Sequence, residues 1–173
     1  MTSDSEARHL ILLRHAKAEH PEKVEDLQRP LSLVGRRQAA KVGAALAADG
    51  MVPDLVLCSS SVRTRQTWEL ARAALGSTPD VRFEEGIYFA GARDLLEIVQ
   101  AVSDDVRTLL VVGHEPTMSH VAAGLAGPDS DPTTLARVRV GVPTASWSLL
   151  TVGTAWHELT SGGATLERLT LPE

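Results

Sequence analysis

The chain has 173 residues and a single cysteine, Cys58, so it cannot form an internal disulfide. A lone thiol is typical of a reducing compartment, and we expect a cytoplasmic protein. No apolar run approaches the roughly 18 residues that span a membrane, which excludes a transmembrane helix. The N-terminus is largely polar and acidic, unlike a signal peptide, and we expect residues 1–7 to be flexible.

The chain also lacks a basic excess, a fixed-period repeat and a low-complexity segment. Its net charge is -5, so it has no electrostatic footprint for nucleic acid. An acidic total still allows an anionic substrate, because a few clustered arginines create a local positive pocket. The length favours one domain over residues 1–173 with one proper core, and we expect a monomer.

Short apolar runs alternate with segments of helical periodicity. Strands are predicted at residues 10–13, 54–58, 81–83 and 108–112, and helices at 32–49, 59–75, 94–102 and 117–125. A polar loop joins the first strand to the first helix, and the tail at 145–152 and 165–171 is expected to form antiparallel edge strands. This alternation predicts an α/β fold with three layers, α/β/α, around a mostly parallel central sheet.

Polar side chains follow three of the predicted strands where each strand ends. The first strand is followed by Arg14 and His15. The second is followed by a segment that carries Arg63, and the third by His114. Ligands of open α/β sheets bind beyond the carboxyl ends of strands, where these groups would meet. Guanidinium forks and helix N-terminal amides hold phosphate oxygens, and imidazole is a nucleophile, so the sequence predicts a phosphoryl site.

Some of these side chains have a structural interpretation as well. Arg63 falls in the first turn of a helix, where the dipole disfavours a cation unless an anion is bound. A surface ion pair with Glu69 or Asp54 explains it equally well. Arg29 either lines the pocket or braces its own loop. Lys17 is a candidate cation at the pocket mouth, and its alternative is solvated surface.

Four segments carry a family pattern: Leu12–Glu19; Asp26–Ser32 with Gly35, Gln38 and Ala39; Cys58–Thr67; and Val112–Thr117. With these segments the chain resembles the histidine phosphatase superfamily, also called the phosphoglycerate-mutase-like family. It is most similar to the small SixA-type branch. The segments stand in family order, which makes them far more specific than an Arg-His pair alone. Many members have glycine after the histidine; Ala16 stands there in this chain, as in the SixA branch.

The resemblance implies a phosphoglycerate-mutase-like fold and a phosphatase that needs no metal or other cofactor. It implies that His15 is the nucleophile, forming a transient phosphohistidine that water then hydrolyses. Arg14, Arg63 and His114 would hold the phosphate oxygens, with Arg29 and Lys17 as further substrate-binding candidates. The partner would be a phosphorylated substrate, either a phosphohistidine protein, which the SixA resemblance favours, or a small phosphomonoester.

The general acid is left open by the resemblance. Larger relatives carry an acidic donor in the region of Glu84 and Glu85, and Glu85 matches their spacing to Tyr88 better. Alternatively, both are surface carboxylates. A substrate with a good leaving group, such as a phosphoramidate, would need a donor less.

Other functions fit less well. Only four residues separate Cys58 from Arg63, one fewer than in cysteine phosphatases, and a phosphoglycerate mutase needs longer insertions. A non-catalytic phosphate- or phosphoprotein-binding module would lose the histidine, yet His15 and His114 are both present. A metallohydrolase is weaker, because no carboxylate–histidine cluster has helical ligand spacing. The remaining histidines are interpreted as structural or exposed: His9, His20, His120 and His157.

Overall fold

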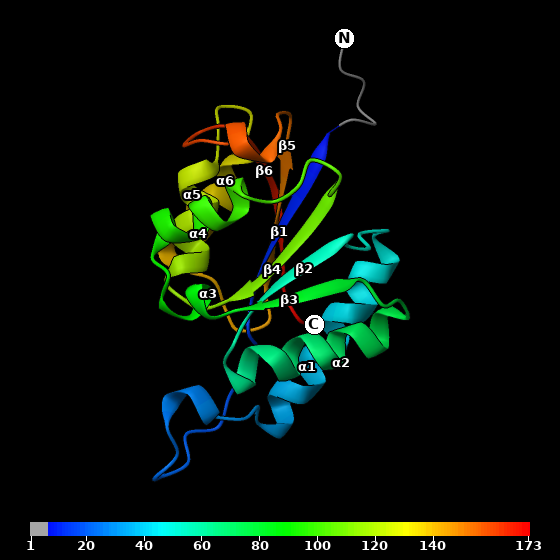
Figure 1. The fold of residues 1–173 in the computed structure, drawn as a ribbon, viewed down its shortest axis with the longest axis vertical. Helices are drawn as coiled ribbons and strands as arrows, with labels where there is room; N and C mark the ends of the chain where they lie inside the picture. The colour runs from blue at the N-terminus through cyan, green and yellow to red at the C-terminus, as the bar shows by residue number, and fades with distance from the viewer. Residues whose placement is uncertain (1–6) are drawn as a thin grey trace.

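The computed structural model describes residues 7–173, so the expected flexibility of residues 1–7 falls, Ala7 apart, outside the described residues. Figure 1 shows the elements. They are β1 (Arg8–Arg14), the 3-10 helix η2 (Asp26–Gln28), α1 (Leu33–Ala48), β2 (Leu55–Ser59), α2 (Val62–Leu75), β3 (Asp80–Glu84), α3 (Glu85–Phe89), α4 (Ala92–Gln100), β4 (Thr108–Gly113), α5 (Thr117–Leu125), α6 (Pro132–Val140), β5 (Trp147–Val152), the 3-10 helix η3 (Trp156–Glu158) and β6 (Ala164–Thr170).

The strands form one six-stranded sheet in the order β3-β2-β4-β1-β5-β6. The first four of these strands are mutually parallel, whereas β5 is antiparallel to β1 and β6 is antiparallel to β5. The predicted mostly parallel sheet is therefore confirmed. The tail does supply antiparallel pairing, with β6 at the edge and β5 between β6 and β1.

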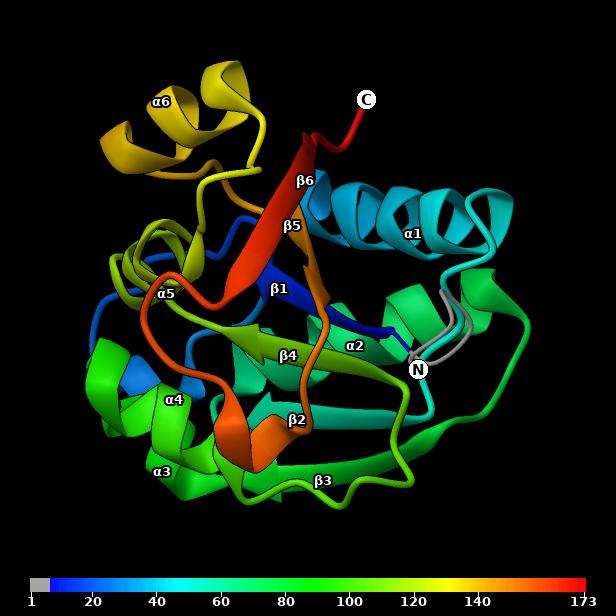
Figure 2. The same ribbon diagram turned by 90° about the horizontal axis from the view of Figure 1, so that it is seen from above.

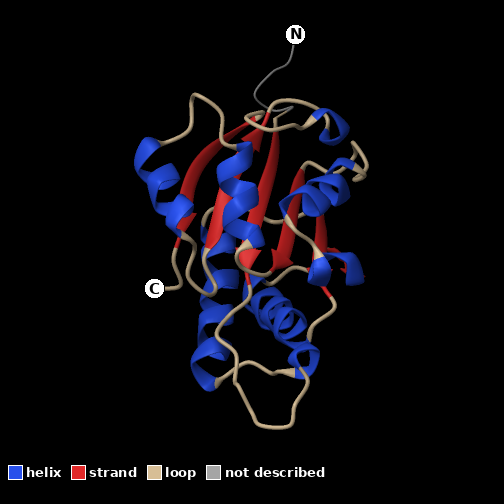
Figure 3. Ribbon diagram, turned by 90° about the vertical axis from the view of Figure 1, so that its left-hand side faces the viewer, coloured by secondary structure: helices blue, strands red, loops and turns tan. Residues whose placement is uncertain are grey.

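Alternate residues of the central strands face opposite sides of the sheet. In β1, Leu10 and Leu12 belong to one buried cluster and Ile11 and Leu13 to the other. The first cluster includes side chains of α4 and α5, and the second includes those of α1 and α2. Figures 1 and 2 show these helix pairs on opposite faces, and Figure 3 shows the strands between them. Because both faces are covered, the strands are continuous apolar runs, and the three-layer α/β/α prediction is confirmed.

Serine caps fix where the two helices nearest the strand ends begin. The Ser32 side chain accepts a hydrogen bond from the Gly35 amide at the start of α1, as predicted. The Ser61 side chain accepts from the Thr64 amide, so α2 begins at Val62 rather than at the first serine. Because α2 begins at Val62, its second residue, Arg63, lies in the first turn of the helix, at the carboxyl edge of the sheet.

Two α-helices were not predicted. α3 has only five residues and one buried side chain, Ile87, so it leaves no periodic pattern. α6 begins with Pro132 behind the N-cap Asp131 and buries only Val138. Both helices are too weakly amphipathic for hydrophobic periodicity to detect.

Residues 16–30 form a long excursion beyond the carboxyl ends of the parallel strands (Figures 1 and 3). Its base is closed by an antiparallel bridge between Ala18 and Leu31. α1 packs directly on this base: a Cβ on Gly35 would lie 1.9 Å from the Lys17 carbonyl oxygen. Only glycine permits that approach, so the start of α1 fixes the root of the excursion beside the strand ends.

Candidate active site

The three strand exits converge as the sequence predicted. β1 and β2 both pair in parallel with β4, which lies between them, so their carboxyl ends are neighbours. A cavity of about 350 Å³ opens at this edge. The four predicted side chains, Arg14, His15, Arg63 and His114, all line it. Two imidazoles and two guanidiniums therefore share one hollow, large enough for a phosphoryl group and part of a leaving group.

His15 is buried in the cavity wall, with 8% of its surface exposed. Its Nδ1 lies 2.7 Å from the Ala16 carbonyl oxygen. A carbonyl only accepts, so Nδ1 carries the proton and Nε2 keeps its lone pair. Burial, assisted by the neighbouring His114, Arg63 and Arg14, lowers the pKa of His15 from 6.5 to about 3, although the bond to Ala16 opposes this effect. The ring is therefore neutral at neutral pH, in the tautomer that leaves Nε2 free.

Arg14 and Arg63 each have a buried Nε–H that finds no hydrogen-bond partner among the described residues. Other donors of each guanidinium are held: Arg14 Nη1 donates to the Val142 carbonyl at 2.8 Å, and Nη1 and Nη2 of Arg63 donate to Asp26. Burial lowers the pKa of Arg14, while the carboxylate of Glu115 opposes this effect. A buried charged donor without an acceptor is costly, so both side chains are suited to an anion in the cavity.

His114 lies next to His15, with ring centroids 5.4 Å apart. Its Nε2 is 2.7 Å from the Ser59 hydroxyl, and its Nδ1 is 3.4 Å from Nη2 of Arg63. The Arg63 group can only donate, so Nδ1 accepts and Nε2 donates to Ser59. Burial and the nearby Arg63 lower the pKa of His114 from 6.5 to about 4, although Asp26 opposes them. His114 is thus a second neutral imidazole, oriented by the strand end of β2.

The mouth of the cavity is formed by the root of the 16–30 excursion. Lys17 and Arg29 both line the cavity there, Lys17 exposed and Arg29 half-buried. Arg29 also donates from Nε to the Glu19 carbonyl at 3.0 Å, so it braces its loop as well as lining the pocket. His20 is exposed, as interpreted from the sequence, yet it lines the cavity too, a position that no feature of the sequence indicated.

Asp26 and Tyr88 connect the mouth to the arginines, and sequence reasoning did not assign either a role. The Asp26 carboxylate is 3.0 Å from both Arg63 Nη2 and Arg29 Nη1, and the Tyr88 hydroxyl donates to it at 2.6 Å. The Arg63 partner is therefore Asp26, and the alternative of a pair with Glu69 or Asp54 is wrong. Both residues belong to segments already singled out, but their meeting depends on a fold contact between residues 62 positions apart.

Glu115 is a further side chain that sequence reasoning missed. Its Oε1 accepts from the Ser119 amide at 2.7 Å and its Oε2 from the Val142 amide at 3.0 Å. It thus ties the end of β4 to the segment whose carbonyl holds Arg14. The charge next to the family-like Gly113-His114 pair was visible in the sequence, but its two partners were not.

Glu85, the predicted general acid, lies in the first turn of α3 and is exposed. It is not among the residues that line the cavity. The structure therefore does not bring Glu85 together with the other predicted residues, and its role as an acid stays a prediction.

The alternative nucleophile Cys58 lies within β2 and is fully buried. Burial raises the pKa of its thiol to about 12, so it is an unreactive core side chain. Within residues 7–173, no group of three or more His, Cys, Asp or Glu side chains is placed to hold a metal ion. No helix in the described part of the chain is long and apolar enough to cross a membrane.

Comparisons with known proteins agree with this geometry. Residues 10–87 match the family model described as Histidine phosphatase superfamily (branch 1). An uncharacterized protein of Mycobacterium tuberculosis is 37% identical over 161 residues, which cover 92% of this chain and 99% of that protein. A solved structure of a candidate phosphohistidine phosphatase SixA from Nakamurella multipartitia is 36% identical and covers 96% of each chain, with a TM-score of 0.80. The protein histidine phosphatase SixA complexed with tungstate shares the fold at 19% identity, with a TM-score of 0.77 over 95% of this chain and 97% of that one.

Proposed function

Because the chain belongs to the histidine phosphatase superfamily, in its SixA-type branch, and is a phosphatase, we propose that it works without a metal ion through a phosphohistidine on His15. The observation that carries this proposal is the hydrogen bond from Nδ1 of His15 to the Ala16 carbonyl. It leaves a neutral Nε2 in a cavity lined by two arginines, each with a buried Nε–H that has no partner in the described part of the chain. Substrate phosphate has both a nucleophile and a binding site there.

In the first step, the Nε2 lone pair attacks phosphorus, the Nε2–P bond forms and the bond to the leaving group breaks. The leaving group departs with the bonding electrons and is protonated from solvent or by an acid, for which Glu85 remains the candidate. In the second step, a water molecule attacks phosphorus, the Nε2–P bond breaks and inorganic phosphate is released. The tautomer does not change during this cycle, because Nδ1 keeps its proton on the Ala16 carbonyl.

The charge that develops on the phosphoryl oxygens is met by fixed donors. Arg14 is anchored through Nη1 and Arg63 through Nη1 and Nη2, and both arginines line the cavity that would receive the phosphoryl oxygens. Such preorganised donors stabilise the transition state without reorganising during the reaction. Lys17 and Arg29 at the mouth add positive charge that attracts the anion.

We propose phosphohistidine on a protein as the first substrate to test, with small phosphomonoesters second. The relative from Nakamurella multipartitia named for phosphohistidine supports this order. An imidazole leaving group also suits a cavity whose walls do not contain Glu85. A cytoplasmic, monomeric protein is proposed with it.

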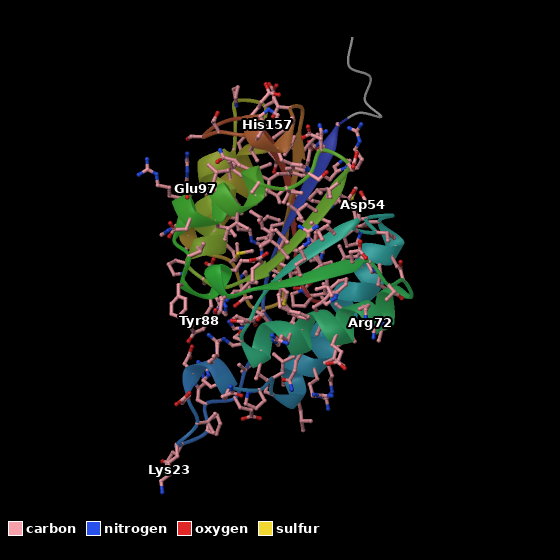
Figure 4. All side chains as sticks on the ribbon, in the orientation of Figure 1. Lys23, Asp54, Arg72, Tyr88, Glu97 and His157 are labelled. Carbon is pink, nitrogen blue, oxygen red and sulfur yellow. The ribbon has the colours of Figure 1, made fainter. Side chains whose placement is uncertain are left out.

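The test compares the wild type with His15→Ala in buffer containing a chelator, using a phosphohistidine protein and a panel of phosphomonoesters. We expect turnover and an acid-labile phosphoenzyme in the wild type, and neither in His15→Ala, which should still bind tungstate. The matched control is His157→Ala, since His157 is exposed and lies at the far end of the molecule from Tyr88 (Figure 4).

Turnover that survives in His15→Ala, or that the chelator abolishes in the wild type, would overturn the proposed mechanism. Oxyanion binding without any turnover by the wild type would instead favour the non-catalytic binding module.

A further inference from the structure

Asp26 is the only carboxylate that the described structure places against both Arg29 and Arg63. Its Oδ1 is 3.0 Å from Arg29 Nη1, and its Oδ2 is 3.0 Å from Arg63 Nη2. Its backbone carbonyl accepts a second bond from Arg63, from Nη1 at 2.7 Å. One residue of η2 therefore holds both Nη groups of a guanidinium that belongs to α2.

Tyr88 supplies the third side of this cluster. Its hydroxyl donates to Oδ2 of Asp26 at 2.6 Å, and its ring packs edge-on against His114 with centroids 5.5 Å apart. Figure 4 shows Tyr88 between α3 and the segment that carries η2, whose tip is marked by Lys23. The contacts of Asp26 thus reach the mouth, the buried arginine and, through Tyr88, the second imidazole.

The orientation of Arg63 depends on this arrangement. With Nη1 and Nη2 bound to Asp26, the planar guanidinium has one fixed orientation, and its buried Nε–H has no partner among residues 7–173. Five donors of one rigid fork cannot turn independently, so holding one edge of the fork aims the other. Release from Asp26 would let Arg63 turn in the cavity.

The Asp26 charge also opposes the positive charge of the site. The hydrogen bond from Tyr88, assisted by Arg63 and Arg29, lowers the pKa of Asp26 from 3.8 to about 2, so the carboxylate is ionised at neutral pH. A phosphate on the cavity side of Arg63 would feel its repulsion across the guanidinium. That repulsion weakens the binding of substrate and product alike, and product release gains from it.

We propose that Asp26 is a positioning residue with two effects: it aims Arg63 at the phosphoryl group, and its charge limits how tightly product phosphate is retained. The proposal rests on the proposed function, since it requires an oxyanion in the cavity. Tyr88 assists by holding the Asp26 carboxylate in place.

The experiment measures kcat and the inhibition constants of inorganic phosphate and tungstate for wild type, Asp26→Asn, Tyr88→Phe and Glu25→Gln. Glu25 is the matched control, because it precedes Asp26, is exposed and makes no side-chain capping bond. We expect Asp26→Asn to bind both oxyanions about 3- to 10-fold more tightly, because a like charge is removed. We expect its kcat to fall about tenfold, because Arg63 is no longer aimed.

Tyr88→Phe keeps the Asp26 charge, so we expect a smaller fall in kcat with unchanged oxyanion affinity. Half of the Asp26 side chain is exposed, with 50% of its surface accessible, so these substitutions should leave the fold intact. Unchanged kcat and affinity in Asp26→Asn, or the same shift in Glu25→Gln, would overturn the inference. If the wild type turns over substrate but Asp26→Asn shows no such shift, the proposed function stands and only this inference fails. If the wild type binds no oxyanion, both fail.

Discussion

The floor and the mouth of the cavity are built in different ways. The floor consists of Arg14, His15 and His114, which directly end or follow buried parallel strands. The mouth consists of exposed or half-buried side chains on the 16–30 excursion, such as Lys17 and Arg29. The floor is therefore as rigid as the sheet, whereas the mouth is held by a bridge and a few side-chain contacts.

Under the proposed mechanism, this contrast divides two tasks between the two parts. Chemistry requires preorganised groups whose position does not depend on the substrate, and the strand ends would provide them. Attraction and selection of the substrate tolerate more variation in the positions of the side chains, and side chains on a surface segment such as 16–30 have that freedom. Arg63 is the point of contact between the two parts, since it is buried in α2 yet bonded to Asp26.

The largest expected difference concerns the arginines. Arg14→Lys and Arg63→Lys should lower kcat/KM by about 100- to 1000-fold, because each removes a fixed planar donor that we propose holds the phosphoryl group. Arg29→Lys at the mouth should cost about tenfold or less, mainly in KM, because it retains the charge. Steady-state kinetics with one substrate for all three variants measures this. Equal losses in kcat at floor and mouth would contradict the division.

The pH dependence of the free energy of unfolding should arise mainly from the two histidines of the floor. His15 and His114 take up a proton near pH 6.5 when unfolded, but only near pH 3 and pH 4 when folded. The native state therefore loses stability as the pH falls below about 6.5, by roughly 1–2 kcal/mol per histidine between pH 7 and pH 5. Denaturant unfolding of wild type and His15→Gln at these two pH values measures it, and His15→Gln should lose less.

The mouth offers a control for this measurement. The pKa of Asp26 is lowered from 3.8 to about 2, so its ionisation contributes to stability above that range and is lost only below about pH 4. Asp26→Asn should therefore leave the change between pH 7 and pH 5 as it is in the wild type. If Asp26→Asn changed the stability difference between pH 7 and pH 5 by a large amount, the attribution of this pH dependence to the two histidines would be wrong.

The last comparison concerns Thr67, which lies behind the floor. This buried hydroxyl accepts from the Ala16 amide at 2.9 Å and donates to the Arg63 carbonyl at 2.7 Å. Thr67→Val leaves the Ala16 amide unpaired and should lower the free energy of unfolding by about 1–3 kcal/mol. Thr133→Val, on the exposed side of α6, should change it by less than about 0.5 kcal/mol. Chemical denaturation of both variants provides the comparison.

The sequence predicted the floor better than the mouth, for a physical reason. Arg14, His15 and His114 adjoin apolar strands, and the rule that parallel strand ends share one edge brings them together without further information. The position of Arg63 could be predicted from the serine-capped helix that follows β2. For the mouth, the sequence offered Arg29 and Lys17 with alternatives, and Arg29 fulfils both of its alternatives.

Local patterns were sufficient for the alternation of strands and helices, the serine caps and the histidines and arginines at the strand ends, because each of these depends on residues a few positions apart. The three-dimensional fold was needed for the meeting of Asp26 with Tyr88, for the two bonds of Glu115 and for the exclusion of Glu85 from the cavity wall. It was needed also for the proton on Nδ1 of His15, because a tautomer depends on which acceptor the folded backbone presents to the ring.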